Sequence, residues 1–207
     1  ELYQDIKKNC KIKSGDVILD IGANDGTLLK YFKKDQIITI GCEPANNLKK
    51  ELKKNCHYMI NDFWNTKHLK KIPSKYQKLK VISAIGMFYD LENPSEFIKH
   101  VADALDDDGI FVAQLMCSHS MFRTNDLGNI CHEHLEYYSY KSLKYLFEKN
   151  GLKIFKMSEN KINGGSYRIY CKKNIKKSIK FKEHTGYNEI IKFIQRVKQN
   201  KKMSLDF

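Results

Sequence analysis

The sequence predicts an α/β fold in which a doubly wound, mostly parallel sheet of seven strands ends in an antiparallel hairpin. Short apolar runs, typical of buried strands, alternate five times with stretches of helical periodicity. Such alternation produces a parallel sheet with helices on both faces. Two further strand-like runs flank Asn163-Gly164-Gly165, which indicates a hairpin turn. The 207 residues are enough for one domain with a full core.

Each expected strand is an apolar run bounded by polar or turn-forming residues. In chain order the runs are VILDIG (17–22), IITIGCEP (37–44), HYMINDF (57–63), KVISAIGMF (80–88), GIFVAQLM (109–116), LKIFKMS (152–158) and SYRIYCK (166–172).

Helices are expected between these strands, where apolar residues recur every three or four positions. They fall at residues 1–10, after Gly26, after Pro44, from Asn93 to Asp108-Gly109, and from Ser139 to Asn150-Gly151. Asn93 as N-cap, with proline next and glutamate third in the helix, is a strong helix start. Residues 185–207 should form a last helix with an apolar face made of Ile190, Ile191, Ile194 and Val197.

Composition excludes several classes of protein. No apolar run approaches the ~18 residues that a membrane-spanning helix needs, and the first ten residues lack the apolar core of a signal peptide. Six scattered cysteines without a C-x-x-C pair indicate reduced thiols in the cytoplasm rather than a disulfide framework or a zinc knuckle. The chain does not begin with Met, so we expect it to be a piece of a longer protein.

The net charge of +13 raises the question of nucleic-acid binding. Only three of the 37 basic residues are arginines, at positions 123, 168 and 196. Arginine is the stronger marker of phosphate and base recognition, whereas lysines spread over solvated faces serve solubility first. Specific nucleic-acid binding is therefore not expected, although the lysines around 172–202 keep an RNA-binding or RNA-modifying module as an alternative.

The loop after the first strand, Asp20-Ile-Gly-Ala-Asn-Asp-Gly26, has the character of a nucleotide-binding turn. Gly22 allows close approach of a ligand, Asn24 tolerates a positive φ, and the helix after Gly26 presents free N–H groups. The spacing is not the G-x-G-x-x-G of a dinucleotide fingerprint, and Asp20 would repel a pyrophosphate. An acidic loop suits the amine and sulfonium of S-adenosylmethionine, which is the expected cofactor.

Two more acidic positions support this cofactor. Glu43 ends the second strand and can accept both ribose hydroxyls, while Asp62-Phe63 after the third strand could contact the adenine amine and ring face. Each carboxylate alone is ordinary at a strand end, but three on consecutive strand ends indicate one site.

The segment Cys131-His132-Glu133-His134 lies in the longest expected connection of the sheet, roughly 117–138. Its contiguous side chains cannot all converge on one tetrahedral ion, and there is no H-E-x-x-H spacing, so no metal is expected. An imidazole can remove a proton near neutral pH. In an extended segment His132 and His134 would share a face and Glu133 would point away, so the residues alone leave open which histidine is the base.

The motifs D-I-G-A-N-D-G-T, G-C-E-P, C-H-E-H-L-E-Y-Y-S and N-G-G-S-Y-R-I-Y occur here in one order. Over roughly residues 14–173 the chain resembles the S-adenosylmethionine-dependent sugar C-methyltransferases, which act on nucleotide-linked keto-deoxysugars. The resemblance implies a Rossmann-like class I methyltransferase domain at residues 1–175. It also implies a truncated start of a C-terminal substrate-holding region at 176–207, and flanking domains that are missing from this chain.

The resemblance also implies roles for single residues. His134 would be the base that forms an enolate, with Glu133 and His132 beside it. The substrate would lie near Tyr89, Tyr137, Gly164, Gly165 and Ser166.

One departure concerns Cys131, since members of the family often carry Tyr at this position. The alternatives left open are O- or N-methylation of another small metabolite, and a cofactor-binding scaffold without activity. The lack of an Asn/Asp-Pro-Pro-aromatic motif at Phe88-Tyr89 opposes methylation of base amines.

Overall fold

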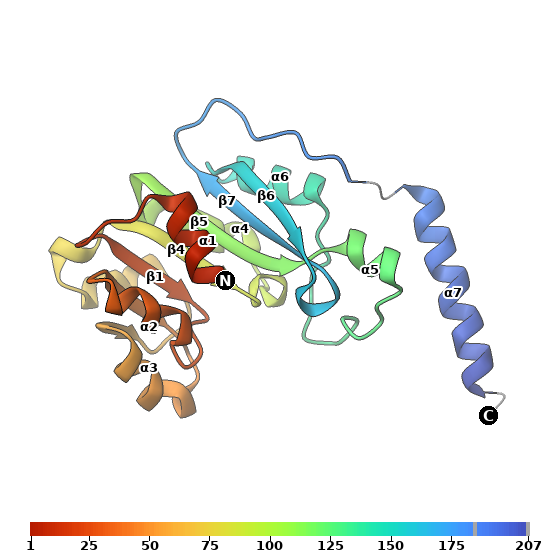
Figure 1. Ribbon diagram of the computed structural model, residues 1–207, viewed down its shortest axis with the longest axis horizontal. Coiled ribbons are helices and arrows are strands. Elements are labelled where there is room, and N and C mark those ends of the chain that lie inside the picture. Colours follow the sequence, from red (N-terminus) through yellow and green to blue (C-terminus); the bar gives the residue numbers. More distant parts are fainter. Residues whose placement is uncertain (184–185, 206–207) are drawn as a thin grey trace.

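The computed structural model describes residues 1–183 and 186–205, and it contains the expected seven-stranded sheet. The strand order is β3-β2-β1-β4-β5-β7-β6 (Figure 1). The strands are β1 (Val17–Ile21), β2 (Ile38–Cys42), β3 (Tyr58–Ile60), β4 (Leu79–Ile85), β5 (Leu105–Met116), β6 (Lys153–Asn160) and β7 (Ser166–Lys172). The strands β1 to β5 pair in parallel, and β7 pairs antiparallel with both β5 and β6. The predicted fold class is confirmed.

Helices cover both faces of the sheet. The helices are α1 (Leu2–Cys10), α2 (Thr27–Lys34), α3 (Lys49–Asn55), α4 (Pro94–Ala104), α5 (Ser118–Thr124), α6 (Tyr140–Lys149) and α7 (Tyr187–Leu205). Short 3-10 helices are η1 (Asn46–Leu48), η2 (Thr66–Lys71), η3 (Ser74–Tyr76), η4 (Phe88–Asp90) and η5 (Ile162–Gly164).

The core is divided by the sheet into two layers. Ile18 of β1 packs with Phe32 of α2 on one face, together with residues of α1 and α3. Leu19, its neighbour in β1, packs with Val101 of α4 and Phe147 of α6 on the other face. Because successive strand residues point to opposite faces, a strand buried on both sides must be apolar throughout. This explains the uninterrupted runs in the sequence.

The helix starts were predicted well and one helix end was not. The Asn93 side chain accepts the Glu96 N–H at 3.1 Å, and Ser139 caps α6 in the same way. However, α4 ends at Ala104 rather than at Asp108-Gly109, and Leu105 already pairs with Leu79 of β4. The fifth strand therefore starts four residues earlier than predicted, because backbone pairing with a distant strand ends the helix.

The last helix, α7, extends away from the sheet and contacts the rest of the protein through α5 (Figure 1). Phe193 is buried against Phe122 of α5, with ring centroids 5.2 Å apart, and Arg196 donates to the Phe122 carbonyl. Ile190 and Ile194, predicted for the apolar face, are exposed. The helix is thus confirmed over 187–205; positions 185, 206 and 207 lie outside the described residues. Among the described helices, none has the length and apolar character needed to cross a membrane.

Candidate active site

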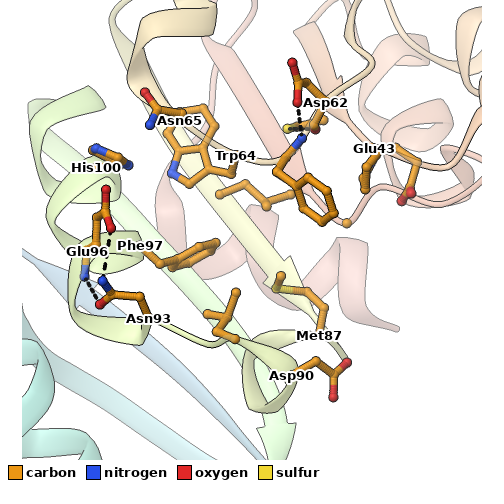
Figure 2. A pocket seen from close by; sticks show the side chains of 16 residues that line it. Glu43, Asp62, Trp64, Asn65, Met87, Asp90, Asn93, Glu96, Phe97 and His100 are labelled. Carbon is orange, nitrogen blue, oxygen red and sulfur yellow. Dashed lines mark hydrogen bonds between the residues drawn. The ribbon is translucent and has the colours of Figure 1, made fainter. Parts of the chain in front are cut away.

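A cavity of about 450 Å³ opens at the carboxyl ends of β1 to β4 (Figure 2). The strand order changes direction between β1 and β4, because β2 and β3 lie on one side of β1 and β4 and β5 on the other. Ligands of open α/β sheets bind at such a switch point. The cavity is lined by Ile21, Gly22, Cys42, Glu43, Pro44, Asp62, Phe63, Trp64, Asn65, Met87, Asp90, Leu91, Asn93, Glu96, Phe97 and His100.

The glycine loop has the backbone conformation that its sequence predicted. Gly22, Asn24 and Gly26 have φ of 68°, 52° and 79°. A Cβ atom at Gly22 would lie 3.0 Å from the Met87 side chain, so a side chain at this position would narrow the cavity. Gly22 lines the cavity, whereas Gly26 caps α2 and packs against α3.

Glu43 lies at the end of β2, as expected, and its carboxylate lines the cavity. One carboxylate oxygen accepts the Asn24 N–H at 3.0 Å, and the other accepts the Ala45 N–H at 2.9 Å. These two hydrogen bonds fix the carboxylate between the glycine loop and the start of η1. Each oxygen keeps a lone pair, so the fixed carboxylate can accept two hydroxyl groups.

Asp20 differs from the expectation of a charge facing the ligand. Its side chain is 4% exposed, it is not among the residues that line the cavity, and it accepts a hydrogen bond from Ser83 of β4 at 2.6 Å. Burial raises the pKa of Asp20 to about 7, the Ser83 hydrogen bond opposes this, and the negative charge of Glu43 adds to it. Asp20 therefore joins β1 to β4 behind the loop.

The cavity is nevertheless acidic, although the protein is strongly basic. Glu43, Asp62, Asp90 and Glu96 line it, and His100 is the single basic side chain among the lining residues. Asp62 lies after β3, as expected; it accepts the N–H of its neighbour Phe63 at 2.9 Å, and Phe63 is 76% exposed. Four carboxylates around apolar walls fit a ligand that combines an aromatic base with a sulfonium and an ammonium group.

Of the sixteen lining residues, sequence reasoning named four as site residues: Gly22, Glu43, Asp62 and Phe63. Trp64 and Asn65 directly follow the predicted pair Asp62-Phe63, and Met87, Asp90 and Leu91 follow β4. Asn93, Glu96, Phe97 and His100 come from one side of α4, at spacings of three and four. That spacing is the available signal, because residues three and four apart share a helix face.

The His-Glu-His segment forms a turn beside the cavity. The His134 N–H donates to the Cys131 carbonyl, so the segment is not extended and His132 and His134 do not share a face. The His134 ring lies against Tyr89 with centroids 4.4 Å apart, whereas the side chains of His132 and Glu133 are exposed and 3.3 Å apart at their closest charged atoms. The N–H groups of Leu135 and the next residue donate to the Tyr89 carbonyl.

One carbonyl group holds His134. Its Nδ1 lies 2.8 Å from the Asn129 carbonyl oxygen, which also accepts the Tyr137 hydroxyl at 3.1 Å. Because a carbonyl only accepts, neutral His134 carries its proton on Nδ1 and keeps a lone pair on Nε2. Tyr89 is buried and donates to the Gly86 carbonyl, and Tyr137 is the exposed one of the two tyrosines.

The glycine turn between β6 and β7 packs against this segment. The Asn129 side chain donates to the Asn163 carbonyl at 3.0 Å and to Asp126 at 2.6 Å. Gly164 and Gly165 have φ of 73° and 124°, and a Cβ atom would overlap Asp126 at the first and Ser120 at the second.

The residue after the two glycines is buried. Ser166 donates to the Ile162 carbonyl. In this structure the turn contacts the loop that holds His134.

Fold and site together define an S-adenosylmethionine-dependent class I methyltransferase. The chain belongs to the methyltransferase domain family, whose model matches residues 1–156.

Similar proteins agree with this class. The chain is 24% identical over 160 residues to the C-methyltransferase NovU of Streptomyces niveus, covering 77% of this chain and 38% of that protein. The chain thus spans less than two fifths of this relative. A methyltransferase structure from Aquifex aeolicus has a TM-score of 0.60 at 14% identity, over 82% of this chain and 88% of that one. Magnesium protoporphyrin IX methyltransferase from Synechocystis, solved with S-adenosylmethionine, has a TM-score of 0.58 at 12% identity, over 82% and 74%.

Proposed function

We propose that this protein methylates a carbon atom of a nucleotide-linked keto-deoxysugar, with His134 as the base that removes the proton beside the ketone. The observation that carries this proposal is the position of His134. It packs on Tyr89 of η4, whose next residue, Asp90, lines the cofactor cavity. We infer that the turn at Tyr89-Asp90 would bring the base and the methyl donor to one edge of the sheet.

The proposed cofactor contacts follow from the lining residues. Glu43 would hold the ribose hydroxyls, the loop from Gly22 to Asn24 would face the methionine end, and Asp62-Phe63 would border the adenine. When bound, S-adenosylmethionine supplies an electrophilic methyl group. Asp20, Ser83 and Gly26 would support this site through β1, β4 and α2.

The base works through its free nitrogen. His134 Nε2 takes the proton from the carbon next to the ketone, and the electron pair of that C–H bond forms the enolate. With the cofactor bound, this enolate carbon would accept the methyl group, and the S–CH₃ electron pair would stay on sulfur. The Asn129 carbonyl keeps the second ring nitrogen protonated and would stabilise the imidazolium that forms.

Other residues of the segment would contact or position the sugar. Tyr137 is exposed beside His134 and can hydrogen-bond a hydroxyl group, and Glu133 and His132 lie on the open side of the turn. Gly164, Gly165 and Ser166 would act from the neighbouring β-turn. The C-methyltransferase activity of NovU supports carbon as the methylated atom. The six free thiols support a cytoplasmic location.

The test is product analysis with a keto-sugar nucleotide and the cofactor. We expect a new C–CH₃ group by NMR and cofactor-dependent turnover. In His134→Ala, proton exchange at the target carbon and turnover should both fall about 10²–10⁴-fold. Tyr145→Ala, at an exposed position of α6 that does not line the cavity, is the control and should leave both exchange and turnover unchanged. Methylation of oxygen or nitrogen, or unchanged exchange in His134→Ala, would refute the proposal.

A further inference from the structure

The loop that carries His134 joins two helices, and one C-terminal segment contacts it at both ends. Residues 125–139 connect α5 to α6 and contain no helix or strand. The C-terminal segment, residues 173–183 and 186–205, follows β7, contacts the start of α6 and ends as α7 beside α5 (Figure 1). Its contacts with the two helices therefore bear on where the loop begins and ends.

At the start of the loop, Arg196 of α7 binds the carboxyl end of α5. Its Nη2 donates to the Phe122 carbonyl at 2.6 Å, and its Nε lies 3.4 Å from the side-chain oxygen of Asn125. Phe122 is in the last turn of α5, where carbonyl groups lack partners within the helix. A positive charge is also favourable at this end of the helix dipole. Arg196 thus fixes the point at which the loop leaves α5.

At the end of the loop, Glu183 binds the amino end of α6. One carboxylate oxygen accepts the Tyr140 N–H and the hydroxyl group of Tyr167 of β7, each at 2.5 Å. Tyr140 is the first residue of α6, so its N–H has no partner within the helix. A carboxylate is favourable here because the helix dipole is positive at its amino end. Burial, and then the hydrogen bond to Glu183, raises the pKa of Tyr167, so its phenol stays a donor.

The part of the segment that carries Glu183 is attached to the sheet. The Ile179 N–H donates to the Ile154 carbonyl of β6 at 2.8 Å, and the buried Ser178 hydroxyl accepts the Ile154 N–H at 3.1 Å. The Tyr140 hydroxyl donates to the Ile179 carbonyl. Because strand β6 anchors this part of the segment, Glu183 holds the start of α6 against a fixed part of the fold.

We infer that Arg196 and Glu183 are positioning residues for the loop, and that they hold His134 in place through the two loop ends. Neither side chain lines the cofactor cavity. Between the ends, the Leu135 N–H donates to η4 and the Asn129 carbonyl holds Nδ1 of His134. Release of either end lets these inner contacts open. The inference rests on the proposed function, because it concerns the base of that reaction.

The first measurement needs no substrate. In protein labelled with ¹⁵N-histidine, NMR should show neutral His134 protonated on Nδ1, because the Asn129 carbonyl accepts that proton. The His134→Ala variant identifies the signal among the seven histidines. In Arg196→Ala and in Glu183→Ala the signal should move toward the Nε2-protonated form that an exposed histidine prefers. An unchanged tautomer in both variants would overturn the inference.

Hydrogen exchange gives the magnitude of the effect. The Leu135 and Glu136 amides, which donate to the Tyr89 carbonyl, should exchange about fivefold to tenfold faster in each alanine variant, the value of one net hydrogen bond. Amides of β1, which open with the whole fold, report any general loss of stability. Equal acceleration in the loop and in β1 would mean that the two residues stabilise the fold without positioning the loop.

Conservative variants keep the test valid if the alanine variants do not fold. Glu183→Gln keeps an acceptor oxygen and Arg196→Lys keeps a donor, so each should accelerate loop exchange less than alanine does. Arg123→Ala is the matched control for Arg196, because Arg123 lies on α5, is exposed and has Glu159 at 3.9 Å as its partner. It should change neither the tautomer nor loop exchange, and an effect as large as that of Arg196→Ala would contradict the inference.

Cofactor binding and turnover separate this inference from the proposed function. Affinity for S-adenosylhomocysteine, measured by calorimetry, should stay unchanged in Glu183→Gln and Arg196→Lys, because the cavity lining is untouched. With a substrate that is turned over, kcat should fall while KM for the cofactor stays constant. A loss of cofactor affinity without a change in the His134 tautomer would overturn the inference. If no keto-sugar is methylated, the proposed function fails, whereas the tautomer and the exchange rates still decide this inference.

Discussion

Substitution of Gly164 by alanine tests whether the glycine turn positions the catalytic loop. At φ 73° an L-residue costs about 1–2 kcal/mol. The new Cβ would also overlap the Asp126 carboxylate, which must then rotate and give up its hydrogen bonds to Gly128 and Asn129. At about 0.5–1.5 kcal/mol for each bond, the free energy of unfolding should fall by roughly 2–5 kcal/mol in total.

Gly151→Ala is the matched control. Gly151 has φ 81°, and a Cβ atom there would meet nothing within 4 Å, so only the backbone cost applies. Urea unfolding gives the stability of both variants, and turnover is measured where both are folded. We expect Gly164→Ala to lose turnover as well, because Asn129, which holds His134, is displaced. Equal stability and equal turnover in the two variants would show that the turn does not position the loop.

Two other residues give predictions about stability. The raised pKa of Asp20 means that the folded protein keeps a proton which the unfolded protein releases, so wild-type stability should fall as pH rises from about 4 to about 7. Asp20→Asn should lack this slope in urea unfolding at pH 5 and pH 8, and an unchanged slope would contradict the burial argument. Arg168, 5% exposed, pairs with Asp5 of α1 and with Gln114 of β5. Asp5 is partly exposed and keeps the Tyr170 hydroxyl and Lys156 as partners, so Arg168→Met should cost about 1–3 kcal/mol by thermal or urea unfolding. A cost below about 1 kcal/mol would mean that the Arg168–Asp5 pair contributes little to stability.

The sheet could be predicted because its strands are buried on both faces. An apolar run such as VILDIG has no other role in a globular domain of this size. The positive φ of Asn24 could also be predicted, since Asn is one of the few side chains that tolerates it. Both features depend on the residues of one short segment, so they can be predicted from the sequence of that segment.

Long-range contacts explain what could not be predicted. Leu105 leaves helix α4 because Leu79 offers it a strand partner. The buried residue of α7 is Phe193 because α5 lies beneath it, although the periodicity favoured Ile190 and Ile194. The spacing of the cavity residues of α4 shows that they share a helix face, but it does not show that this face borders a cavity.

The acidic lining has a consequence for turnover. Methyl transfer removes the positive charge from sulfur. The demethylated product therefore interacts with the carboxylates of the cavity less favourably than S-adenosylmethionine does. The lining carboxylates thus favour binding of S-adenosylmethionine over binding of the demethylated product. Rising ionic strength should reduce the difference between the affinities for these two compounds.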